Sequence, residues 1–542
     1  MNDSRNELTA DDARHTARIC VPVRPRRASE IAEAVARASR EADLVEIRFD
    51  HLDPAELEAA PAHVAPLLDS PATLVFTLRP REQGGARESA DDEREHFWRR
   101  LAREMRRHAD ASGANPEHER GRLRHYADLE LDGGPSAETC AGLARVCRII
   151  RSHHDFAGGA QDLTRLYERL AATDADALKL AVTARDATDC VPVFRLLERA
   201  RTERRKLVAV AMGRAGVATR VLGPSRGAPF TYAALDAENT TAPGQLTSQE
   251  LRDLYRLDST DSRTLVNGLV GSPVTHSLSP VMHNRAFAAR GLNAVYLPFE
   301  VTDLEAFVRR MVRPATRELE WNLRGLSVTA PHKTAVMSLL DRTTGRARLV
   351  GAVNTVTVES DGTLAGDNTD AEAFAAPLRD SSWPRELTAL RGARVALLGA
   401  GGAARAAAWA LRERGARVTV FARDLGRALS LASDFDADAA PLEGASLGRF
   451  DLVVNATPLG TRGPLEESTP ADAEQLRGAR LAYDLVYNPT DTLFMREARA
   501  AGCETLGGLA MLVAQGEEQF RLWTGEDAPA GVMRRAAEEA LK

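Results

Sequence analysis

The sequence contains very little lysine. Of its 71 basic residues only four are lysine, at positions 179, 206, 333 and 542, and the other 67 are arginine. Arginine therefore supplies nearly all of the positive charge, and each lysine raises the question of what an amine does there that a guanidinium does not. An amine can lose its proton and attack a carbonyl carbon, whereas a guanidinium stays charged.

Cysteine, net charge and long apolar segments are also scarce. The five cysteines form no CxxC pair and no ligand-spaced cluster, which favours reduced thiols in a cytoplasmic setting over disulfides or structural zinc. The net charge of −6 gives no reason to expect nucleic acid or an anionic membrane as a partner. No apolar run reaches transmembrane length and the N-terminal segment is polar, so we expect a soluble intracellular protein without a bound metal.

The first half of the chain alternates short apolar segments with charged amphipathic ones. Eight apolar segments are typical of strands: residues 19–23, 44–49, 74–79, 126–131, 148–152, 177–182, 207–212 and 230–235. Eight β/α units in ~250 residues predict a closed parallel (β/α)8 (TIM) barrel, with its active site at the C-terminal ends of the strands. We expect the charged stretch 81–125 to form a loop and a helix outside this barrel.

Lys179 lies within the apolar segment ALKLAV, which is a costly environment for an ammonium group. Polar residues stand near the ends of neighbouring segments: Glu46 with Arg48 and Asp128 with Glu130, each pair two residues apart and therefore on one face of its strand, and also Arg79 and His154. A lysine paired with an acid in the barrel core is the structural alternative. The polar cluster favours Lys179 as a nucleophile and His154, whose ordinary pKa is near neutrality, as a base beside an imine.

Six segments of the first half resemble type I 3-dehydroquinate dehydratases, in the order of that family: VEIRFDHL, TLRPREQGG, IIRSHHDF, ALKLAV, AMGRAGVATR and TAPGQ. The resemblance spans residues 18–257 and implies a Schiff base between Lys179 and the C3 ketone of 3-dehydroquinate, with His154 exchanging the protons. It implies substrate contacts by Glu46, Arg48, Arg79, Arg220, Thr241 and Gln245, among which Arg220 would hold the carboxylate. The chain departs from the family at Gln83, where many members have glutamate, and at Thr241, where many have serine.

A polar break at residues 258–263 precedes a nucleotide-binding signature in the second half. In RVALLGAGGAARAAAWAL (394–411), a strand leads into glycines that allow a pyrophosphate to approach the backbone at a helix N-terminus. The next strand, RVTVFARD, ends in Arg423 and Asp424. Arg423 would hold a 2'-phosphate and Asp424 would favour a free 2'-hydroxyl, so we expect NADP, with NAD as the alternative.

The second half resembles shikimate dehydrogenases over residues 264–542, through THSLSPVMHN, GLSVTAPHK, VGAVNT, GDNTD, GAGGAA, NATPLG, YDLVYNP and GGLAMLVAQ. The resemblance implies that Lys333 and Asp370 exchange the proton of the substrate's C3 oxygen while hydride moves to or from the nicotinamide. It implies substrate contacts by Ser277, Ser279, Thr329, Asn354, Tyr487 and Gln515. It implies cofactor contacts by Gly399, Ala400, Gly401, Gly402, Ala403, Arg423, Asn455 and Thr457. In SLSP, Pro280 fits the first turn of a helix and Ser279 its cap.

The two halves predict consecutive reactions. The first would convert 3-dehydroquinate into 3-dehydroshikimate and the second would reduce this product to shikimate, an order that resembles the plant-type bifunctional enzymes. We expect a polar tail (1–17), the barrel (18–257), a linker (258–263), an α/β substrate domain (264–370), a Rossmann NADP domain (371–490) and C-terminal helices packing back on the substrate domain (491–542).

Two other functions remain open at this point, and a third possibility is that only one of the two domains is active. For the enzyme, small-molecule substrates are the predicted partners. The second half could be a quinate dehydrogenase, with the dehydratase acting in quinate catabolism. The chain could instead be a non-catalytic ligand-sensing regulator. A regulator would be expected to lose one of Lys179, His154, Lys333 and Asp370, and all four are present. The oligomeric state is left open by the sequence.

Overall fold

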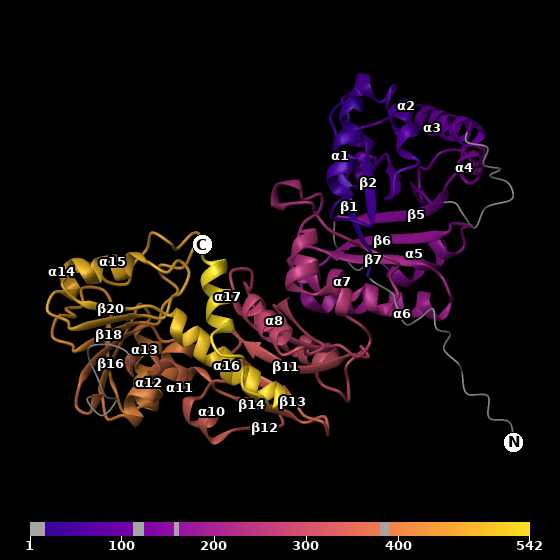
Figure 1. Cartoon of the computed structure of the whole chain (residues 1–542). Coiled ribbons are helices and arrows are strands. Elements are labelled where there is room, and N and C mark those ends of the chain that lie inside the picture. Colours follow the sequence, from indigo (N-terminus) through magenta and orange to yellow (C-terminus); the bar gives the residue numbers. More distant parts are fainter. Residues whose placement is uncertain (1–16, 112–123, 157–161, 380–389) are drawn as a thin grey trace, which may run out of the picture. The chain divides into compact units, whose positions relative to one another are not determined.

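The computed structural model describes residues 17–111, 124–156, 162–379 and 390–542 (Figure 1). Contacts within the chain divide it into two compact units, one ending at Thr264 and the other beginning at Leu265. Each unit has its own sheets and its own apolar cores.

The first unit is built on an eight-stranded parallel sheet in the order β7-β6-β5-β4-β3-β2-β1-β8. Its strands are β1 (Ile19–Val23), β2 (Leu44–Arg48), β3 (Thr73–Thr77), β4 (Tyr126–Glu130), β5 (Arg148–Asp155), β6 (Ala177–Thr183), β7 (Leu207–Met212) and β8 (Thr231–Tyr232). Each of the eight predicted segments contains one of these strands or most of it. The (β/α)8 barrel architecture is therefore confirmed.

The barrel is nearly closed rather than closed. β8 is two residues long and pairs with β1, and the described strands include no ladder between β8 and β7. The prediction of a strand over 230–235 was too long because the chain changes partner after Tyr232. Ala234 forms a bridge with Thr247 instead of continuing along the barrel.

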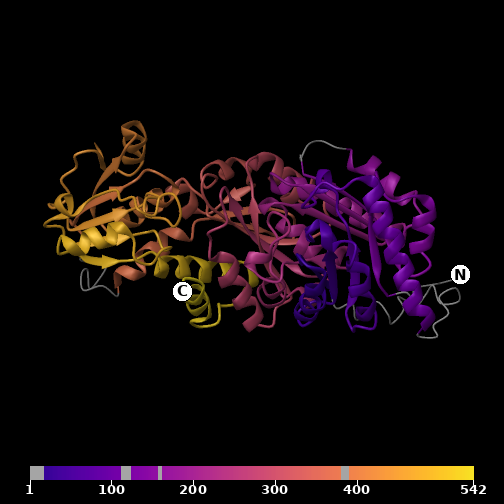
Figure 2. The same ribbon diagram turned by 90° about the horizontal axis from the view of Figure 1, so that it is seen from above.

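Helices connect the strands of the first unit and cover the outside of the sheet (Figures 1 and 2). They are α1 (Ile31–Ala38), α2 (Ala60–Val64), α3 (Asp91–Ala111), α4 (Ala137–Leu143), α5 (Leu163–Ala171), α6 (Cys190–Thr202) and α7 (Val217–Leu222). α3 is the helix predicted outside the barrel. Its apolar side chains Phe97, Trp98 and Leu101 are buried, the helix packs on α2 and α4, and its acidic first turn suits a helix N-terminus.

The second unit begins with a mixed six-stranded sheet in the order β10-β9-β11-β13-β14-β12. Its strands are β9 (Leu265–Gly271), β10 (Ala294–Glu300), β11 (Asn322–Val328), β12 (Arg342–Thr343), β13 (Thr355–Val358) and β14 (Leu364–Asp367). β13 runs antiparallel to both of its neighbours. The helices of this part are α8 (Ser279–Ala289), α9 (Leu304–Phe307), α10 (Gly345–Val350) and α11 (Asp370–Ala375).

A parallel sheet of Rossmann type follows, in the order β17-β16-β15-β18-β19-β20. Its strands are β15 (Arg394–Leu398), β16 (Arg417–Ala422), β17 (Asp438–Pro441), β18 (Leu452–Asn455), β19 (Leu481–Asp484) and β20 (Glu504–Leu506), and its helices are α12 (Gly402–Glu413), α13 (Leu425–Asp434), α14 (Ala473–Leu476) and α15 (Leu493–Ala500). The boundary predicted at residue 490 was wrong because β20 pairs with β19 and completes this sheet. The last helices, α16 (Leu509–Thr524) and α17 (Val532–Ala540), do return to the substrate domain and pack on α8.

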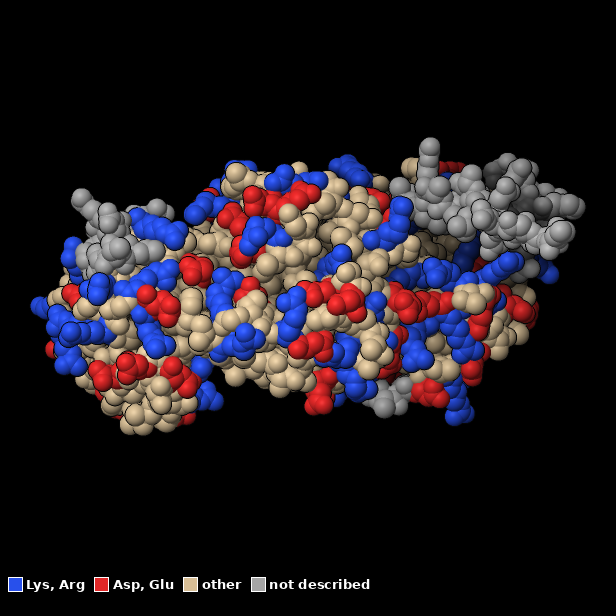
Figure 3. Space-filling view, turned by 90° about the horizontal axis from the view of Figure 1, so that it is seen from below, with Lys and Arg blue, Asp and Glu red and all other residues tan. Residues whose placement is uncertain are grey.

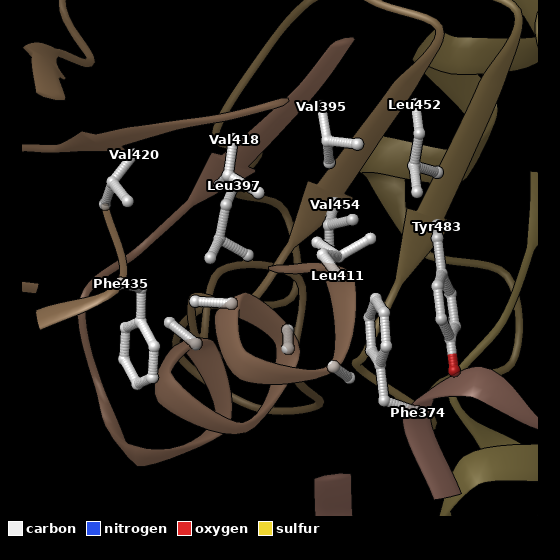
Figure 4. Close-up of a cluster of buried hydrophobic side chains, with 14 of the residues drawn as sticks. Phe374, Val395, Leu397, Leu411, Val418, Val420, Phe435, Leu452, Val454 and Tyr483 are labelled. Carbon is white, nitrogen blue, oxygen red and sulfur yellow. The ribbon is translucent and has the colours of Figure 1, made fainter. Parts of the chain in front are cut away.

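One apolar core joins the Rossmann sheet to the helix that begins at Asp370. Val395, Leu397 and Val454 point from the sheet toward Leu411 of α12, as Figure 4 shows. Phe374 of α11 stacks on Tyr483 of β19, with ring centroids 5.2 Å apart. Packing of this core therefore fixes α11, and with it Asp370, against the dinucleotide-binding domain.

The surface carries charges of both signs. On the face shown in Figure 3, basic side chains are intermixed with acidic ones. None of the described helices is long and apolar enough to cross a membrane.

We predict that Gly325→Ala destabilises the second unit. A Cβ at position 325 would lie 2.1 Å from the indole nitrogen of Trp523, which is buried and donates to the Val356 carbonyl. Such overpacking costs about 1–3 kcal/mol, measurable as a lower midpoint of urea unfolding. The control is Gly345→Ala, since a Cβ there meets no atom within 4 Å. Equal midpoints for the two variants would contradict the prediction.

Candidate active sites

The amine of Lys179 lies inside the barrel among three acceptors. Its Nζ donates to Tyr232 Oη (2.8 Å), Asp128 Oδ2 (2.9 Å) and Glu46 Oε1 (3.2 Å). These residues come from four different strands, and all four are buried. They meet because alternate side chains of a parallel barrel point to its interior.

Two arginines fix the carboxylates beside this lysine. Arg79 donates to Asp128 Oδ2 (2.6 Å), to Glu130 Oε1 (2.7 Å) and to Ser152 Oγ (2.8 Å). Arg94 reaches in from α3 and forms an ion pair with the second oxygen of Glu130. Burial opposes ionisation of Asp128, but Arg79 and Lys179 hold the pKa of Asp128 well below its usual range.

His154 lies at the end of β5 and faces the same pocket. Its backbone N–H donates to Gln83 Oε1 (3.2 Å), and its ring stacks on Phe156 at a centroid distance of 6.5 Å. Its Nδ1 is buried and has no hydrogen-bond partner among the described residues. Burial lowers the pKa of His154 well below its usual value, and the nearby Arg79 and Lys179 lower it further. The imidazole is therefore neutral and able to accept a proton.

Arg220 of α7 is buried without a carboxylate partner among the described residues. Its guanidinium makes long contacts, both 3.5 Å, to the carbonyls of Tyr232 and Pro243, and its Nε has no partner there. Burial lowers the pKa of Arg220 to about 10. A buried and unpaired cation is strongly unfavourable, so this position is suited to an anionic ligand.

The remaining predicted residues of the first site line the same pocket. Thr241 and Gln245 stand at its rim, where the Thr241 N–H donates to Gln245 Oε1 (2.7 Å). Arg48 also lines it and forms a bidentate pair with Asp50 at 2.8 and 2.7 Å. The pocket lining thus contains Lys179, His154, Glu46, Arg48, Arg79, Arg220, Thr241 and Gln245.

A larger groove of about 860 Å³ lies elsewhere in this unit and includes residues of α4 and β5. Its lining holds Cys140 and Arg151, but Arg151 already donates to the Glu130 carbonyl and to the Cys140 sulfur. The smaller pocket contains the lysine, the histidine and the arginine that lacks a carboxylate partner, and we assign the chemistry to it.

The second site centres on the ion pair between Lys333 and Asp370. Lys333 Nζ lies 2.5 Å from Asp370 Oδ2, and both side chains are largely buried. The dinucleotide loop is directly adjacent, because a Cβ added to Gly402 would lie 3.0 Å from Cδ of Lys333. The Lys333–Asp370 pair and the start of α12 are therefore in contact.

Ser277, Ser279 and Tyr487 lie together at the start of α8. The helix begins at Ser279 with Leu278 as its cap, so the prediction that Ser279 is the cap was wrong. The side chain of Ser277 supports this helix start, since its Oγ accepts the Ser279 N–H (3.2 Å). Burial raises the pKa of Tyr487, opposed by its hydrogen bond with Ser277.

Asn354 is anchored in a buried polar network. Its amide accepts from the Thr369 N–H (2.8 Å) and donates to Thr369 Oγ1 (2.9 Å). Gln519 supports it by donating to the Asn354 carbonyl (3.2 Å) and by accepting from Ser327 Oγ (2.7 Å). Gln515, predicted as a substrate contact, donates to the Leu512 carbonyl (2.8 Å). Thr329 is half-buried at the end of β11.

The glycine-rich loop leaves room for a dinucleotide. Gly399 has φ +114°, and a Cβ there would lie 2.9 Å from the Ala456 carbonyl. Gly401 is the cap of α12 and supplies no side-chain acceptor, so the N–H groups of the first turn are available to a phosphate. Ala400 and Ala403 belong to the same loop and first turn. These features fit a dinucleotide.

The two residues that follow β16, Arg423 and Asp424, have different hydrogen-bonding partners. Asp424 accepts the Arg427 N–H (3.1 Å) and caps α13, so its carboxylate serves the helix. Arg423 is exposed beside it, and Arg427 is a second exposed arginine in the first turn of α13.

At the end of β18, which pairs with β15, Asn455 accepts from the hydroxyl and the N–H of Thr457 and donates to Asp484 (2.9 Å). Burial raises the pKa of Asp484 to about 6.

The sequence interpretation assigned no role to several residues at these sites. Tyr232 and Asp128 contact the Lys179 amine, and Gln519 supports Asn354. The alternation that placed Glu46 and Arg48 on one face also places Asp128 inward, so a pattern signal existed for Asp128. The contacts of Tyr232 and Gln519 depend on tertiary packing and had no such signal.

Comparisons with known proteins agree with this arrangement. Residues 19–262 match the type I 3-dehydroquinase family, residues 269–356 the shikimate dehydrogenase substrate-binding domain, residues 384–475 the shikimate/quinate 5-dehydrogenase family and residues 508–538 the shikimate 5'-dehydrogenase C-terminal domain. A relative from Arabidopsis thaliana, the chloroplastic bifunctional 3-dehydroquinate dehydratase/shikimate dehydrogenase, is 32% identical over 97% of this chain and 85% of its own length.

Other relatives match the second half. The shikimate dehydrogenase (NADP(+)) of Methanopyrus kandleri is 43% identical over 52% of this chain and 98% of its own length. Among solved structures, shikimate 5-dehydrogenase from Thermus thermophilus in complex with NADP(H) and shikimate is 42% identical, with a TM-score of 0.45 over 51% of this chain and 100% of that chain. The match of the Arabidopsis relative across both units shows that the chain belongs to the bifunctional 3-dehydroquinate dehydratase/shikimate dehydrogenase family of the shikimate pathway.

Proposed function

We propose that Lys179 is the Schiff-base nucleophile for 3-dehydroquinate and that Lys333 and Asp370 handle the proton when 3-dehydroshikimate is reduced to shikimate. The observation that supports this proposal most directly is that Arg220 is buried without an acidic partner among the described residues, in the same pocket as Lys179 and His154. The pocket therefore suits a ligand that has a carboxylate for the arginine and a carbonyl for the amine.

In the dehydratase half, the Lys179 amine attacks the C3 carbonyl and the resulting carbinolamine loses water to give an iminium ion. The iminium draws electrons from C2, so the neutral His154 imidazole can take a C2 proton. His154 then returns its proton to the C1 hydroxyl, which leaves as water. Arg220 holds the carboxylate, while Glu46, Arg48, Arg79, Thr241 and Gln245 contact the hydroxyls and the carbonyl region.

In the dehydrogenase half, Lys333 and Asp370 exchange the proton of the C3 oxygen. Asp370 keeps Lys333 oriented through the 2.5 Å ion pair. Ser277, Ser279, Thr329, Asn354, Tyr487 and Gln515 bind and orient the substrate. Gly399, Ala400, Gly401, Gly402 and Ala403, together with Asn455 and Thr457, would hold the dinucleotide, which would supply the hydride. We propose that Arg423 contacts the 2'-phosphate, in keeping with the NADP(+) named for the relatives.

The tail and linker boundaries, the preference for shikimate over quinate and the cytoplasmic location stay predictions. Residues 1–16 of the expected tail lie outside the described residues.

Lys179→Ala should abolish imine trapping. Borohydride with 3-dehydroquinate should add the mass of the reduced adduct to the wild-type protein at Lys179 and leave the variant unlabelled, because only an amine forms the imine. Lys206→Ala is the matched control, since Lys206 is the other lysine of the barrel unit and is exposed. Mass spectrometry of the peptides reads out the position, and labelling of Lys179→Ala would refute the assignment.

Arg220→Met should raise KM for 3-dehydroquinate by about 10- to 100-fold, as expected for loss of a charge-assisted hydrogen bond. The same variant should unfold at equal or higher urea concentration, because a buried unpaired charge is removed. Arg201→Met, an exposed substitution on α6, serves as the control. An unchanged KM would show that the carboxylate binds elsewhere.

Asp370→Asn should lower kcat for NADP-dependent shikimate oxidation by about 100-fold while changing NADP affinity little, because the carboxylate that orients Lys333 is lost. Nicotinamide absorbance gives the rate, and a fluorescence titration gives the affinity. Asp367→Asn is the control: Asp367 belongs to the same GDNTD segment but pairs with Arg346. Similar losses in both variants would indicate a structural effect.

A further inference from the structure

Tyr232 is the partner of Lys179 that none of the family motifs in the sequence indicated. Its hydroxyl lies 2.8 Å from Lys179 Nζ, the shortest of the three contacts made by the amine. The same hydroxyl donates to Glu46 Oε1 (3.4 Å). Tyr232 is buried and lines the pocket. Its phenol therefore contacts both the reacting nitrogen and a carboxylate that this nitrogen also contacts directly.

Imine formation requires protons to move at this nitrogen. An ammonium has three N–H groups, and in this pocket each has an acceptor, so Nζ carries no free lone pair until one proton leaves. After the attack on the carbonyl, the carbinolamine oxygen must gain a proton before it can depart as water. A group that both accepts and donates a hydrogen bond beside Nζ can serve both steps.

The three partners of Nζ differ in their ability to do this. Asp128 is already bound by Arg79 and its pKa is lowered, so it is a poor proton acceptor. Glu46 Oε1 receives three donors, from Thr77 (2.9 Å), Lys179 and Tyr232. Tyr232 is the one of the three that carries a hydroxyl. Burial and Glu46 raise the pKa of Tyr232, so it remains a neutral phenol with a proton to donate.

We propose that Tyr232 is a further catalytic residue of the dehydratase half and relays protons between Lys179 Nζ and Glu46. The proposal rests on Lys179 being the nucleophile. In the forward step an Nζ proton moves to Tyr232 Oη while the phenol proton moves to Glu46 Oε1. Tyrosine is unchanged, Glu46 becomes a neutral carboxylic acid, and Nζ gains the lone pair that attacks the carbonyl.

The return step reverses the relay. Once the N–C bond has formed, Tyr232 gives its proton to the carbinolamine oxygen and takes the proton of Glu46. The relay then takes a second proton from the nitrogen, which restores its lone pair, and delivers this proton to the same oxygen. The C–O bond breaks, water leaves, and the nitrogen lone pair forms the iminium, with Tyr232 and Glu46 back in their starting states. Protons and electron pairs balance without a further reagent.

A substitution can separate the role of the Tyr232 hydroxyl from that of its aromatic ring. Lys179 Nζ also lies 4.1 Å from the ring centroid of Tyr232, a cation–π contact that phenylalanine would keep. Tyr232→Phe therefore removes the relay and leaves the packing with Phe230, at a centroid distance of 5.7 Å, in place. The matched control is Tyr126→Phe. Tyr126 belongs to the same apolar cluster, but its hydroxyl accepts from Arg148 (3.2 Å).

The experiment is rapid mixing of the full-length protein with 3-dehydroquinate, followed by borohydride quenching and mass spectrometry at a series of times. Tyr232→Phe should form the imine on the order of 100-fold more slowly than the wild type, with KM changed less than about threefold, and Tyr126→Phe should match the wild type. Imine formation at the wild-type rate in Tyr232→Phe would overturn the relay.

The labelling results and one further substitution separate the alternatives. If the wild type itself is not labelled at Lys179, the proposed nucleophile fails and the relay fails with it. If the wild type is labelled and Tyr232→Phe behaves as the wild type, the relay alone fails. Should the phenylalanine variant not fold, fluorotyrosine at position 232 keeps the shape and makes the phenol more acidic. A relay then changes the rate of imine formation at fixed pH, and an unchanged rate overturns the proposal.

Discussion

The balance of buried charge inside the barrel is the constraint on which the dehydratase site depends. Three cations, Lys179, Arg79 and Arg94, interlock with three carboxylates, those of Glu46, Asp128 and Glu130. Loss of any one would leave a partner buried and uncompensated, which destabilises a protein by several kcal/mol. The same network fixes the position of the amine to within hydrogen-bonding distance of its three acceptors.

Arg220 stands outside this balance and gives the pocket its preference for a ligand. Arg48 is neutralised by Asp50, whereas Arg220 has only carbonyl contacts among the described residues. An incoming carboxylate would restore the balance, so binding of an anionic substrate and stabilisation of the fold act through the same group. The neutral His154 adds no further positive charge and remains able to accept a proton.

In the dehydrogenase half, one ion pair joins residues that follow the substrate-domain sheet to the glycine-rich loop and the Rossmann core. Lys333 follows the substrate-domain strand β11 and lies against Gly402 of the dinucleotide loop. Asp370 begins α11, whose Phe374 packs on Tyr483 of the Rossmann sheet. The ion pair therefore lies where the substrate domain meets the glycine-rich loop, the place that the proposed proton exchange requires.

Local pattern was sufficient to predict the architecture but not the contacts made over long distances in the chain. The apolar pattern located all eight barrel segments, and the period-two alternation gave Glu46 and Arg48 a common face. It could not show that β8 stops after two residues, since this depends on Ala234 pairing with Thr247. It could not show that Arg94, on a helix outside the barrel, reaches Glu130. The prediction also missed β20 as the last strand of the Rossmann sheet. A strand of only three residues has no clear sequence pattern, and β20 is recognised by its pairing with β19.

The scarcity of lysine is explained by what the two largely buried lysines touch. Lys206 and Lys542 are exposed, whereas Lys179 and Lys333 each lie within 3 Å of a buried aspartate. An arginine could form either ion pair, and the chain uses arginine for that purpose at positions 79 and 94. A guanidinium at 179 could not release a proton and bond to carbon, and one at 333 could not exchange a proton with a substrate oxygen. At the two largely buried positions the chain has lysine, the cation that is able to give up a proton, in keeping with the roles proposed for Lys179 and Lys333.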